Sequence, residues 1–278
     1  MPAPRERISY RGFDLRLENG FAAAEAREVV DRVLATGGDR VGFVMDRPGE
    51  ATSGGRRSRI FVKAEFRRPD QALGKRLRPS RAIAEGRGYR RFAGAGLPVV
   101  RLFAFGEQSR LRPRAGAIVV TEKVRGRDAA RTWKRAPSTE LAERAARTLA
   151  AVHAAGFVHG DAVMRNFVLV AAGEYLLDLP GWMRWSPEGA ERDVALLAGS
   201  VQRLGASAAQ MAALLAAYET AVGAPSSRLT AGWRERVLAA ADGYVRHLQE
   251  RDATRPQRRA RKQSSIARPG ERGPSGKG

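Results

Sequence analysis

Cysteine is absent from this chain of 278 residues, and histidine occurs at only three positions, 153, 159 and 247. The lack of thiols excludes disulfide bonds, thiolate nucleophiles and cysteine-ligated zinc, and so few histidines disfavour a histidine-rich metal site. Residues 1–10 lack the apolar core of a signal peptide, and the longest uncharged stretch, 204–218, is too short to cross a bilayer. These absences predict a soluble protein of the cytoplasm.

Negative charge is scarce relative to positive charge. The sequence has 50 lysines and arginines against 29 aspartates and glutamates, which gives a formal net charge of +21. Such an excess indicates an anionic partner, and the phosphates of a nucleotide, a lipid headgroup or a nucleic acid would all serve. The alternative is a solvated basic face without a specific partner.

The order of helix and strand signals divides the chain into a mixed first part and a mainly helical second part. Strands are expected at 41–44, 60–62, 98–105, 117–121, 167–170 and 175–177. Helices are expected at 21–35, 80–94, from Ser138 onward, 188–204, 208–222 and 230–251. We therefore predict an α+β protein with a small β-rich N-lobe (1–122) and a larger helical C-lobe (123–253), with a ligand cleft between them.

The last segment, 254–278, is rich in arginine, lysine, proline, glycine and serine and has scarcely any large apolar residue. This composition predicts a disordered basic C-terminal tail. Such a tail can reinforce attraction to an anionic membrane, bind nucleic acid without specificity, or serve only as an extension.

The most informative segment is Val158 to Phe167, a loop between a helix and a short strand. Asp161 and Asn166 are five residues apart on this loop, so both side chains can point into one cleft. The carboxylate of Asp161 can orient a hydroxyl and accept its proton, while the amide oxygen of Asn166 can bind Mg²⁺. This pattern predicts Asp161 as the catalytic residue and Asn166 as a metal ligand.

A second carboxylate, Asp178, follows the strand 175–177 and precedes a Leu-Pro-Gly turn. At the end of a strand it is well placed to hold a metal ion that bridges phosphate oxygens. Alone, Asp161 would be an ordinary turn residue and Asp178 an ordinary cap. As an ordered set with Asn166, they indicate phosphoryl transfer with Asn166 and Asp178 as the metal ligands.

The order His159, Asp161, Asn166, Asp178 resembles the protein-kinase-like superfamily, in which a loop of the form H-x-D-x-x-x-x-N precedes a metal-binding aspartate. The resemblance implies a protein-kinase-like two-lobed fold that uses ATP and Mg²⁺. It also implies that His159 braces the loop. Lys63, at the end of Ile-Phe-Val-Lys, is similar to the strand lysine that neutralises nucleotide phosphates.

Glu85 lies on the inward stripe of the following helix, together with Ala82, Tyr89 and Phe92. A carboxylate on such a stripe needs a cationic partner. Lys63 is the expected partner, and the alternative is one of the many surface arginines.

Two further positions follow from the superfamily resemblance. The backbone of Glu122 to Val124 is expected to meet the adenine. Asp193 is similar to the aspartate that braces the catalytic loop from the next large helix, and the alternative is an exposed acid at the start of a helix.

Within the superfamily the chain resembles the lipopolysaccharide kinase (Kdo kinase/WaaP-type) family. The resemblance rests on the residue ranges 80–85, 95–100, 105–107 and 159–167. It implies transfer of phosphate from ATP to a sugar hydroxyl of a lipopolysaccharide core or related anionic glycolipid. It further implies peripheral contact with the anionic inner face of the cytoplasmic membrane, and no specific nucleic-acid partner.

The sequence departs from the protein-kinase pattern at several positions, and these departures narrow the prediction of the acceptor. No G-x-G-x-x-G precedes Lys63, and the pair Gly54-Gly55 is the candidate for covering the phosphates. Gly160 replaces the arginine with which switched protein kinases bind an activation-loop phosphate, and no long activation loop separates Asp178 from Asp193. These features favour a small-molecule or glycolipid acceptor and constitutive activity.

Three alternatives stay open at the level of sequence. The acceptor can instead be a protein, as in a Ser/Thr kinase, or a small molecule, as in the aminoglycoside-type phosphotransferases, which also carry H-G-D. The chain can also be a pseudokinase or a basic binding module.

Trp182 and Trp185, just after Asp178, either stack on a sugar or pack inside the helical lobe.

Overall fold

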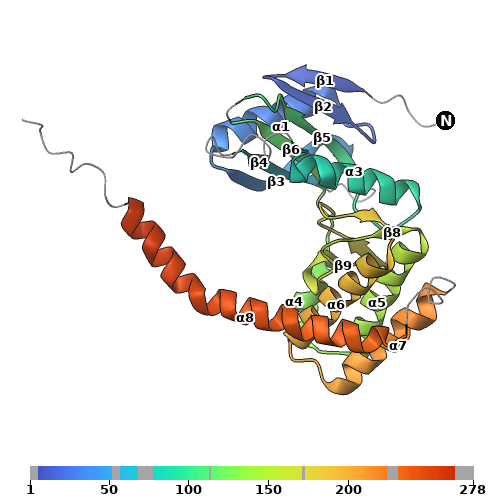
Figure 1. Cartoon of the computed structure of the whole chain (residues 1–278). Coiled ribbons are helices and arrows are strands. Elements are labelled where there is room, and N and C mark those ends of the chain that lie inside the picture. The colour runs from blue at the N-terminus through green and yellow to red at the C-terminus, as the bar shows by residue number, and fades with distance from the viewer. Residues whose placement is uncertain are drawn as a thin grey trace, which may run out of the picture.

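A computed structural model of the chain describes residues 6–51, 57–67, 78–112, 114–170, 173–223 and 231–266. Figure 1 shows a lobe built on one large sheet above a lobe built mainly of helices. The first lobe contains β1 (Arg7–Tyr10), β2 (Phe13–Leu17), α1 (Ala23–Thr36), β3 (Arg40–Ala51), β4 (Arg57–Phe66), α3 (Arg81–Gly94), β5 (Leu102–Gln108) and β6 (Gly116–Glu122). The second contains β7 (Arg127–Asp128), α4 (Ala129–Arg135), α5 (Thr139–Ala154), β8 (Phe157–Val158), η1 (Met164–Asn166), β9 (Phe167–Val170), β10 (Gly173–Leu176), β11 (Met183–Arg184), α6 (Pro187–Gln202), α7 (Ala208–Val222) and α8 (Trp233–Ile266).

The sheet of the first lobe has six strands in the order β1-β2-β5-β6-β4-β3, and every neighbouring pair is antiparallel. Because successive side chains of a strand point to opposite faces, Val62 packs into one core and its neighbour Lys63 faces the other side. Val119 lies on the lysine's side, in the core that also contains α3. The alternation along β4 therefore directs Lys63 toward α3.

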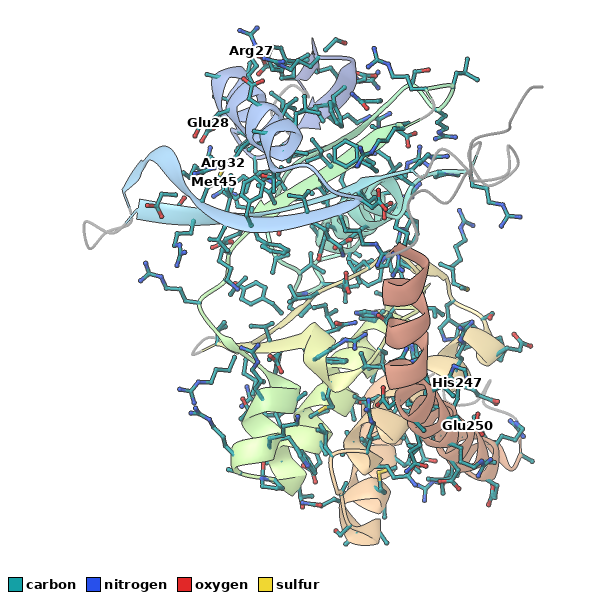
Figure 2. All side chains as sticks on the ribbon, turned by 90° about the vertical axis from the view of Figure 1, so that its left-hand side faces the viewer. Arg27, Glu28, Arg32, Met45, His247 and Glu250 are labelled. Carbon is teal, nitrogen blue, oxygen red and sulfur yellow. The ribbon has the colours of Figure 1, made fainter. Side chains whose placement is uncertain are left out.

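The opposite face of the sheet is covered by α1. Its buried stripe packs against Val62 and Val120 in a separate core. Figure 2 shows this arrangement, with Arg27, Glu28 and Arg32 marking α1 and the buried Met45 marking β3 beneath it. The sheet is thus held between two helices, which fixes the strand that carries Lys63.

Helix α3 begins where the sequence predicts. The hydroxyl of Ser80 accepts the backbone N–H of Ile83 at 3.2 Å, a standard N-cap. Its buried face includes Glu85, Tyr89 and Phe92. A Cβ at Gly86 would clash with the ring of Phe105, so this glycine allows α3 to lie close to the sheet.

The helical lobe is built around α5 and α6. Serine hydroxyls cap α5, α6 and α7 at Ser138, Ser186 and Ser207. The buried side chains of these helices form one continuous core with the inner face of α3. That shared core holds the two lobes against each other around the cleft.

The predicted α+β, kinase-like two-lobed fold is confirmed, and several local predictions differ from the structure. The hairpin of β1 and β2 and the short helix α4 were not predicted. Strands β3 and β4 extend beyond the predicted ranges 41–44 and 60–62. Residues 98–101 lie outside β5, although Val99 bridges to Leu176 of the second lobe. The expected boundary at residue 122 falls at the end of β6.

Helix α8 continues to Ile266, past the predicted end at 251. Alanine, arginine, glutamine and lysine dominate this region, and all four favour helix. The first part of the expected tail is therefore helical, and 267–278 lies outside the described residues. Figure 1 shows the C-terminal half of α8 projecting away from the body. None of the described helices is long and apolar enough to span a membrane.

Candidate active site

Lys63, Glu85 and Asp178 meet at the cleft although they come from three distant parts of the chain. Nζ of Lys63 donates to Oε2 of Glu85 at 2.7 Å and also contacts Oδ1 of Asp178. Partial burial opposes the charge of Lys63, but the two carboxylates raise its pKa above the usual value. Burial raises the pKa of Glu85, and the ammonium of Lys63 opposes that rise. Within the described chain no arginine forms an ion pair with Glu85, so the structure favours the lysine as its partner.

Tyr89 links the same two carboxylate residues, and sequence reasoning placed it only on the buried stripe of α3. Its hydroxyl donates to Oε1 of Glu85 at 3.2 Å and accepts the backbone N–H of Asp178 at 3.0 Å. Asp178 has a φ of +60°, a region that non-glycine residues seldom occupy. The bonds to Tyr89 and Lys63 hold it there. The signal was available, because Tyr89 lies one helical turn after Glu85.

The catalytic loop brings Asp161 and Asn166 into direct contact. Nδ2 of Asn166 donates to the backbone carbonyl of Asp161 at 2.8 Å and to its Oδ2 at 3.2 Å. Because a carbonyl only accepts, the amide nitrogen must face it, which leaves Oδ1 of Asn166 free of any hydrogen bond from the described residues. The loop therefore presents a carboxylate and an amide oxygen side by side.

Asp193 is completely buried, which excludes the alternative of an exposed acid at the start of a helix. Its Oδ2 accepts the backbone N–H of His159 at 2.6 Å, and its Oδ1 accepts that of Gly160 at 2.9 Å. Two charge-assisted bonds to consecutive amides fix the loop just before Asp161.

His159 is also fully buried and stacks on Phe167. Its Nδ1 accepts the backbone N–H of Asp161 at 3.3 Å. Burial lowers the pKa of His159 below its usual value, so the ring is neutral at neutral pH. A neutral ring held inside the lobe supports the shape of the loop.

A buried chain of side chains continues behind Asp193. Nε2 of His153 lies 3.3 Å from Oδ2 of Asp193, and Nδ1 of His153 lies 2.7 Å from the hydroxyl of Tyr218 on α7. Burial raises the pKa of the Tyr218 phenol. Because a carboxylate only accepts, the hydrogen bond between His153 and Asp193 needs the proton on Nε2. Sequence reasoning assigned no role to His153 or Tyr218.

Gly160 has a structural requirement of its own. Its φ is +81°, and a Cβ at this position would clash with the carbonyl oxygen of Gly181. The catalytic loop and the segment after Asp178 thus touch backbone to backbone. An arginine could not replace Gly160 without displacing either the catalytic loop or the segment after Asp178.

Trp182 packs against α3. Its Nε1 donates to the carbonyl of Ala84 at 2.8 Å, and its ring contacts Phe92 and Phe157 edge-on. A Cβ at Gly88 would lie 2.6 Å from Cδ1 of Trp182, which shows how closely the helix approaches. Of the two predictions for Trp182, packing is the one that the structure supports.

The described residues around these side chains enclose a cleft of about 480 Å³, a volume within the range of small-molecule sites. Its lining includes the apolar side chains of Phe61, Val119 and Leu177, the charged side chains of Lys63, Glu85, Arg165 and Asp178, and the neutral amide of Asn166. Glu122 and Val124 also line it. The backbone of Val124 makes no hydrogen bond with any described residue, so it is free to bind a planar base.

The donor set fits a magnesium ion. Asn166 and Asp178 offer oxygen ligands, which Mg²⁺ prefers, and this ion commonly takes one or two protein oxygens together with phosphates and water. No group of three His, Cys, Asp or Glu side chains in the described ranges can hold a metal unaided. Nucleotide phosphates would therefore have to complete the coordination.

The glycine pair proposed to cover the phosphates, Gly54-Gly55, lies outside the described residues. The flanking strands pair from Arg40–Glu65 at one end to Ala51–Arg57 at the other. Lys63 lies near the first end, whereas Arg57 is roughly 20 Å further along β4 at the usual rise per residue.

A model of the lipopolysaccharide kinase (Kdo/WaaP) family matches residues 56–218. This range is more than half of the chain and contains every candidate residue from Lys63 to Asp193. The chain belongs to the lipopolysaccharide kinase (Kdo/WaaP) family. It is accordingly a phosphotransferase of the kinase class, and the family resemblance seen in the sequence is confirmed.

A solved structure of a similar protein agrees with the fold of this lipopolysaccharide kinase family member, and a second similar structure matches it less closely. WaaP in complex with acyl carrier protein superposes with a TM-score of 0.55 at 23% identity, over 84% of this chain and 98% of that chain. An aminoglycoside-3'-phosphotransferase of type VIII has a TM-score of 0.49 at 16% identity, over 77% and 97% of the two chains. Among curated proteins none matches the chain.

Trp182→Phe tests whether the docked indole holds α3 in place. The change keeps an aromatic ring but removes the bond to Ala84, and we expect a loss of about 1 kcal/mol in the free energy of unfolding. Because α3 carries Glu85, we also expect the KM for ATP to rise about threefold or more. Urea denaturation and steady-state kinetics measure the two effects.

Trp233→Phe is the matched control. Nε1 of Trp233 donates to Glu219 at 3.0 Å, between α7 and α8 and away from the cleft. Trp233→Phe should lower the free energy of unfolding by a similar amount without changing the KM for ATP. Equal KM values for the two variants would contradict a role for Trp182 in positioning α3.

Proposed function

We propose that the protein transfers the γ-phosphoryl group of ATP to a sugar hydroxyl of a lipopolysaccharide core or related anionic glycolipid. The observation that carries this proposal is the ion-paired set of Lys63, Glu85 and Asp178 in a nucleotide-sized cleft that Asn166 also lines. Asp161 lies beside this cleft and accepts a hydrogen bond from Asn166. The phosphoryl transfer would take place at the inner face of the cytoplasmic membrane, where such an acceptor is exposed.

Each residue has a distinct task in this reaction. Lys63, held by Glu85, neutralises the phosphates of the nucleotide, and the backbone of Val124 binds the adenine. Asp161 orients the acceptor hydroxyl and takes its proton as the oxygen attacks the γ-phosphorus, whose bond to the bridging oxygen breaks to release ADP. Mg²⁺ on Asn166 and Asp178 would neutralise the charge on the transferred group. Positioning and charge neutralisation supply most of the rate in such reactions.

The segment between Asp178 and α6 favours a glycolipid over a protein acceptor. It is short, and it is engaged in packing, with Trp182 against α3 and Gly181 against Gly160. Its strand β11 pairs with β8. A peptide acceptor needs an extended platform beside the catalytic loop, and these residues are not free to form one.

The charge of the protein favours an anionic acceptor over an aminoglycoside. Aminoglycosides carry several ammonium groups, which would be repelled by a chain with a net charge of +21. Arg165, two-thirds exposed, lies 3.8 Å from the Asp161 carboxylate. An acceptor hydroxyl must therefore approach Asp161 beside a guanidinium group.

The direct test is transfer of labelled γ-phosphate from Mg-ATP. Purified protein is incubated in separate reactions with truncated lipopolysaccharide, casein and kanamycin, and we expect label in the glycolipid. Asp178→Asn should lower turnover at least about a hundredfold, because a metal ligand is lost. Asp242→Asn, the same change at an exposed position of α8, should leave turnover unchanged.

Two results would contradict the proposal in different ways. Label in casein or kanamycin but not in glycolipid would refute the glycolipid as the acceptor, while it would still establish kinase activity. ATP binding with no transfer to any acceptor, and with no effect of Asp178→Asn on binding, would instead support the pseudokinase alternative.

A further inference from the structure

The backbone conformation of Asp178 decides where its carboxylate points. Its φ of +60° lies in the left-handed region, which residues with a side chain seldom occupy. Such a conformation persists only where the surrounding structure holds it. The carboxylate is 33% exposed and lies against Lys63. The contacts that hold this backbone therefore also hold the proposed metal ligand in place.

Both neighbours of Asp178 are fixed by other parts of the protein. Before it, the backbone N–H of Leu177 donates to the carbonyl of Asn166, the second proposed ligand, at 2.8 Å. After it, Leu179 is completely buried against α3. The backbone N–H of Asp178 itself donates, among the described residues, to the hydroxyl of Tyr89 alone.

The Tyr89 hydroxyl can hold this N–H because Glu85 fixes its direction. A phenol has one proton, and Tyr89 donates it to Oε1 of Glu85 at 3.2 Å. The hydroxyl oxygen is then left to accept from Asp178 at 3.0 Å. The other carboxylate oxygen, Oε2, accepts from Nζ of Lys63 at 2.7 Å. An unbroken series of hydrogen bonds thus runs from the Asp178 backbone to Lys63.

Solvent has little access to the middle of this series. Tyr89 is 3% exposed and Glu85 is 4% exposed, and both lie on α3, one turn apart. Buried hydrogen bonds of this kind reinforce one another, and a buried N–H that loses its acceptor is costly. Figure 1 shows α3 at the junction of the two lobes, so this helix connects the lysine of the first lobe to the aspartate of the second.

The direct contact between Lys63 and Oδ1 of Asp178 uses the groups that the two proposed ligands need. Nucleotide phosphate would bind the ammonium group, and magnesium would bind the carboxylate. When both are bound, the Tyr89 hydroxyl provides the remaining hydrogen bond between α3 and Asp178.

We propose that Tyr89 is a positioning residue that couples the metal ligand Asp178 to the phosphate-binding pair of Lys63 and Glu85. The inference rests on the proposed function and adds a relation between the two ligands of that site. Through the Tyr89 hydroxyl, bound magnesium strengthens the binding of the nucleotide, and by linkage the nucleotide strengthens the binding of magnesium to the same extent.

Tyr89→Phe tests this coupling in the full-length protein. Calorimetry measures the dissociation constant of ADP with magnesium and with EDTA, and the ratio of the two constants gives the coupling. We expect Tyr89→Phe to lower this ratio about tenfold, because the N–H of Asp178 loses its acceptor. The affinity for metal-free ADP should change by no more than about twofold, since Lys63 keeps Glu85 as its partner.

Hydrogen exchange at the Asp178 amide provides a second measurement that needs no ligand. In the unaltered protein the Tyr89 hydroxyl protects this N–H. We expect exchange about tenfold faster in Tyr89→Phe, because the protecting hydrogen bond is absent.

Tyr10→Phe is the matched control. The Tyr10 hydroxyl likewise donates to a carboxylate, that of Asp31 at 3.1 Å, and accepts from an N–H, that of Arg11 at 3.3 Å. These contacts lie between β1 and α1, on the face of the sheet opposite α3. Tyr10→Phe should leave both the coupling ratio and the exchange of the Asp178 amide unchanged.

Several results would overturn the coupling. One is an unchanged ratio in Tyr89→Phe, and another is an equal loss in Tyr10→Phe. An equal fall in ADP affinity with magnesium and with EDTA would do so too, because it would show that the substitution only loosens α3. Exchange at Asp178 that is no faster in Tyr89→Phe would show that the hydroxyl does not hold this residue.

The unaltered protein tests the proposed function separately. No gain in ADP affinity from magnesium in that protein would refute the metal ligands of the proposed function, and the inference with them. A normal gain in the unaltered protein that persists in Tyr89→Phe would refute only the inference.

Discussion

Asp161→Asn is expected to lower kcat by about a hundredfold to ten-thousandfold, the range for loss of a positioned general base. The amide oxygen can still accept from Nδ2 of Asn166, which now bonds Oδ2 of Asp161 at 3.2 Å. The loop therefore keeps its shape, but the side chain can no longer take a proton from the acceptor hydroxyl. Steady-state transfer from Mg-ATP to glycolipid measures the loss.

Nucleotide binding serves as the internal control for this variant. Asp161 does not line the cleft, so the affinity for Mg-ADP should change by no more than about twofold. Retention of more than a tenth of the original kcat would show that Asp161 is not the base. A parallel loss of nucleotide affinity would show that the substitution had disturbed the loop instead.

Asp193→Ala is expected to cost about 3–5 kcal/mol of folding free energy, the usual effect of removing one partner from a buried ionic cluster. The substitution leaves the backbone N–H groups of His159 and Gly160 without an acceptor inside the lobe. It also removes the partner of His153. Urea denaturation should show a lower midpoint with an unchanged slope.

Asp252→Ala is the matched control for stability. Asp252 also pairs with an arginine, Arg203, but its side chain is 38% exposed. Exposed pairs contribute about 1 kcal/mol or less, so this variant should stay close to the original stability. Losses of equal size in the two variants would mean that Asp193 does not brace the catalytic loop.

Local signals in the sequence explain the part of the site that was predicted. Asp161 and Asn166 lie on one short loop, so their spacing alone brings them together. Glu85 lies on the inward stripe of a helix that Ser80 caps, and period-2 alternation along β4 turns Lys63 toward that stripe. In each case one element and its periodicity determine where the side chain points.

The residues that were missed act through contacts between distant elements. Tyr89 reaches Asp178 across 89 positions of sequence, and Tyr218 reaches His153 across 65. Both look like ordinary core aromatics in the sequence, because nothing in a buried stripe indicates which hydroxyl finds a polar partner.

The sequence by itself determined the reaction class, the catalytic loop and the family, because those depend on residue types at fixed short spacings. The tertiary structure alone decided that Trp182 packs on α3 and that Gly160 leaves no room for a side chain. These features depend on how elements far apart in the chain fill space against one another. Packing of that kind is determined by shape in three dimensions and leaves no periodic signal along the chain.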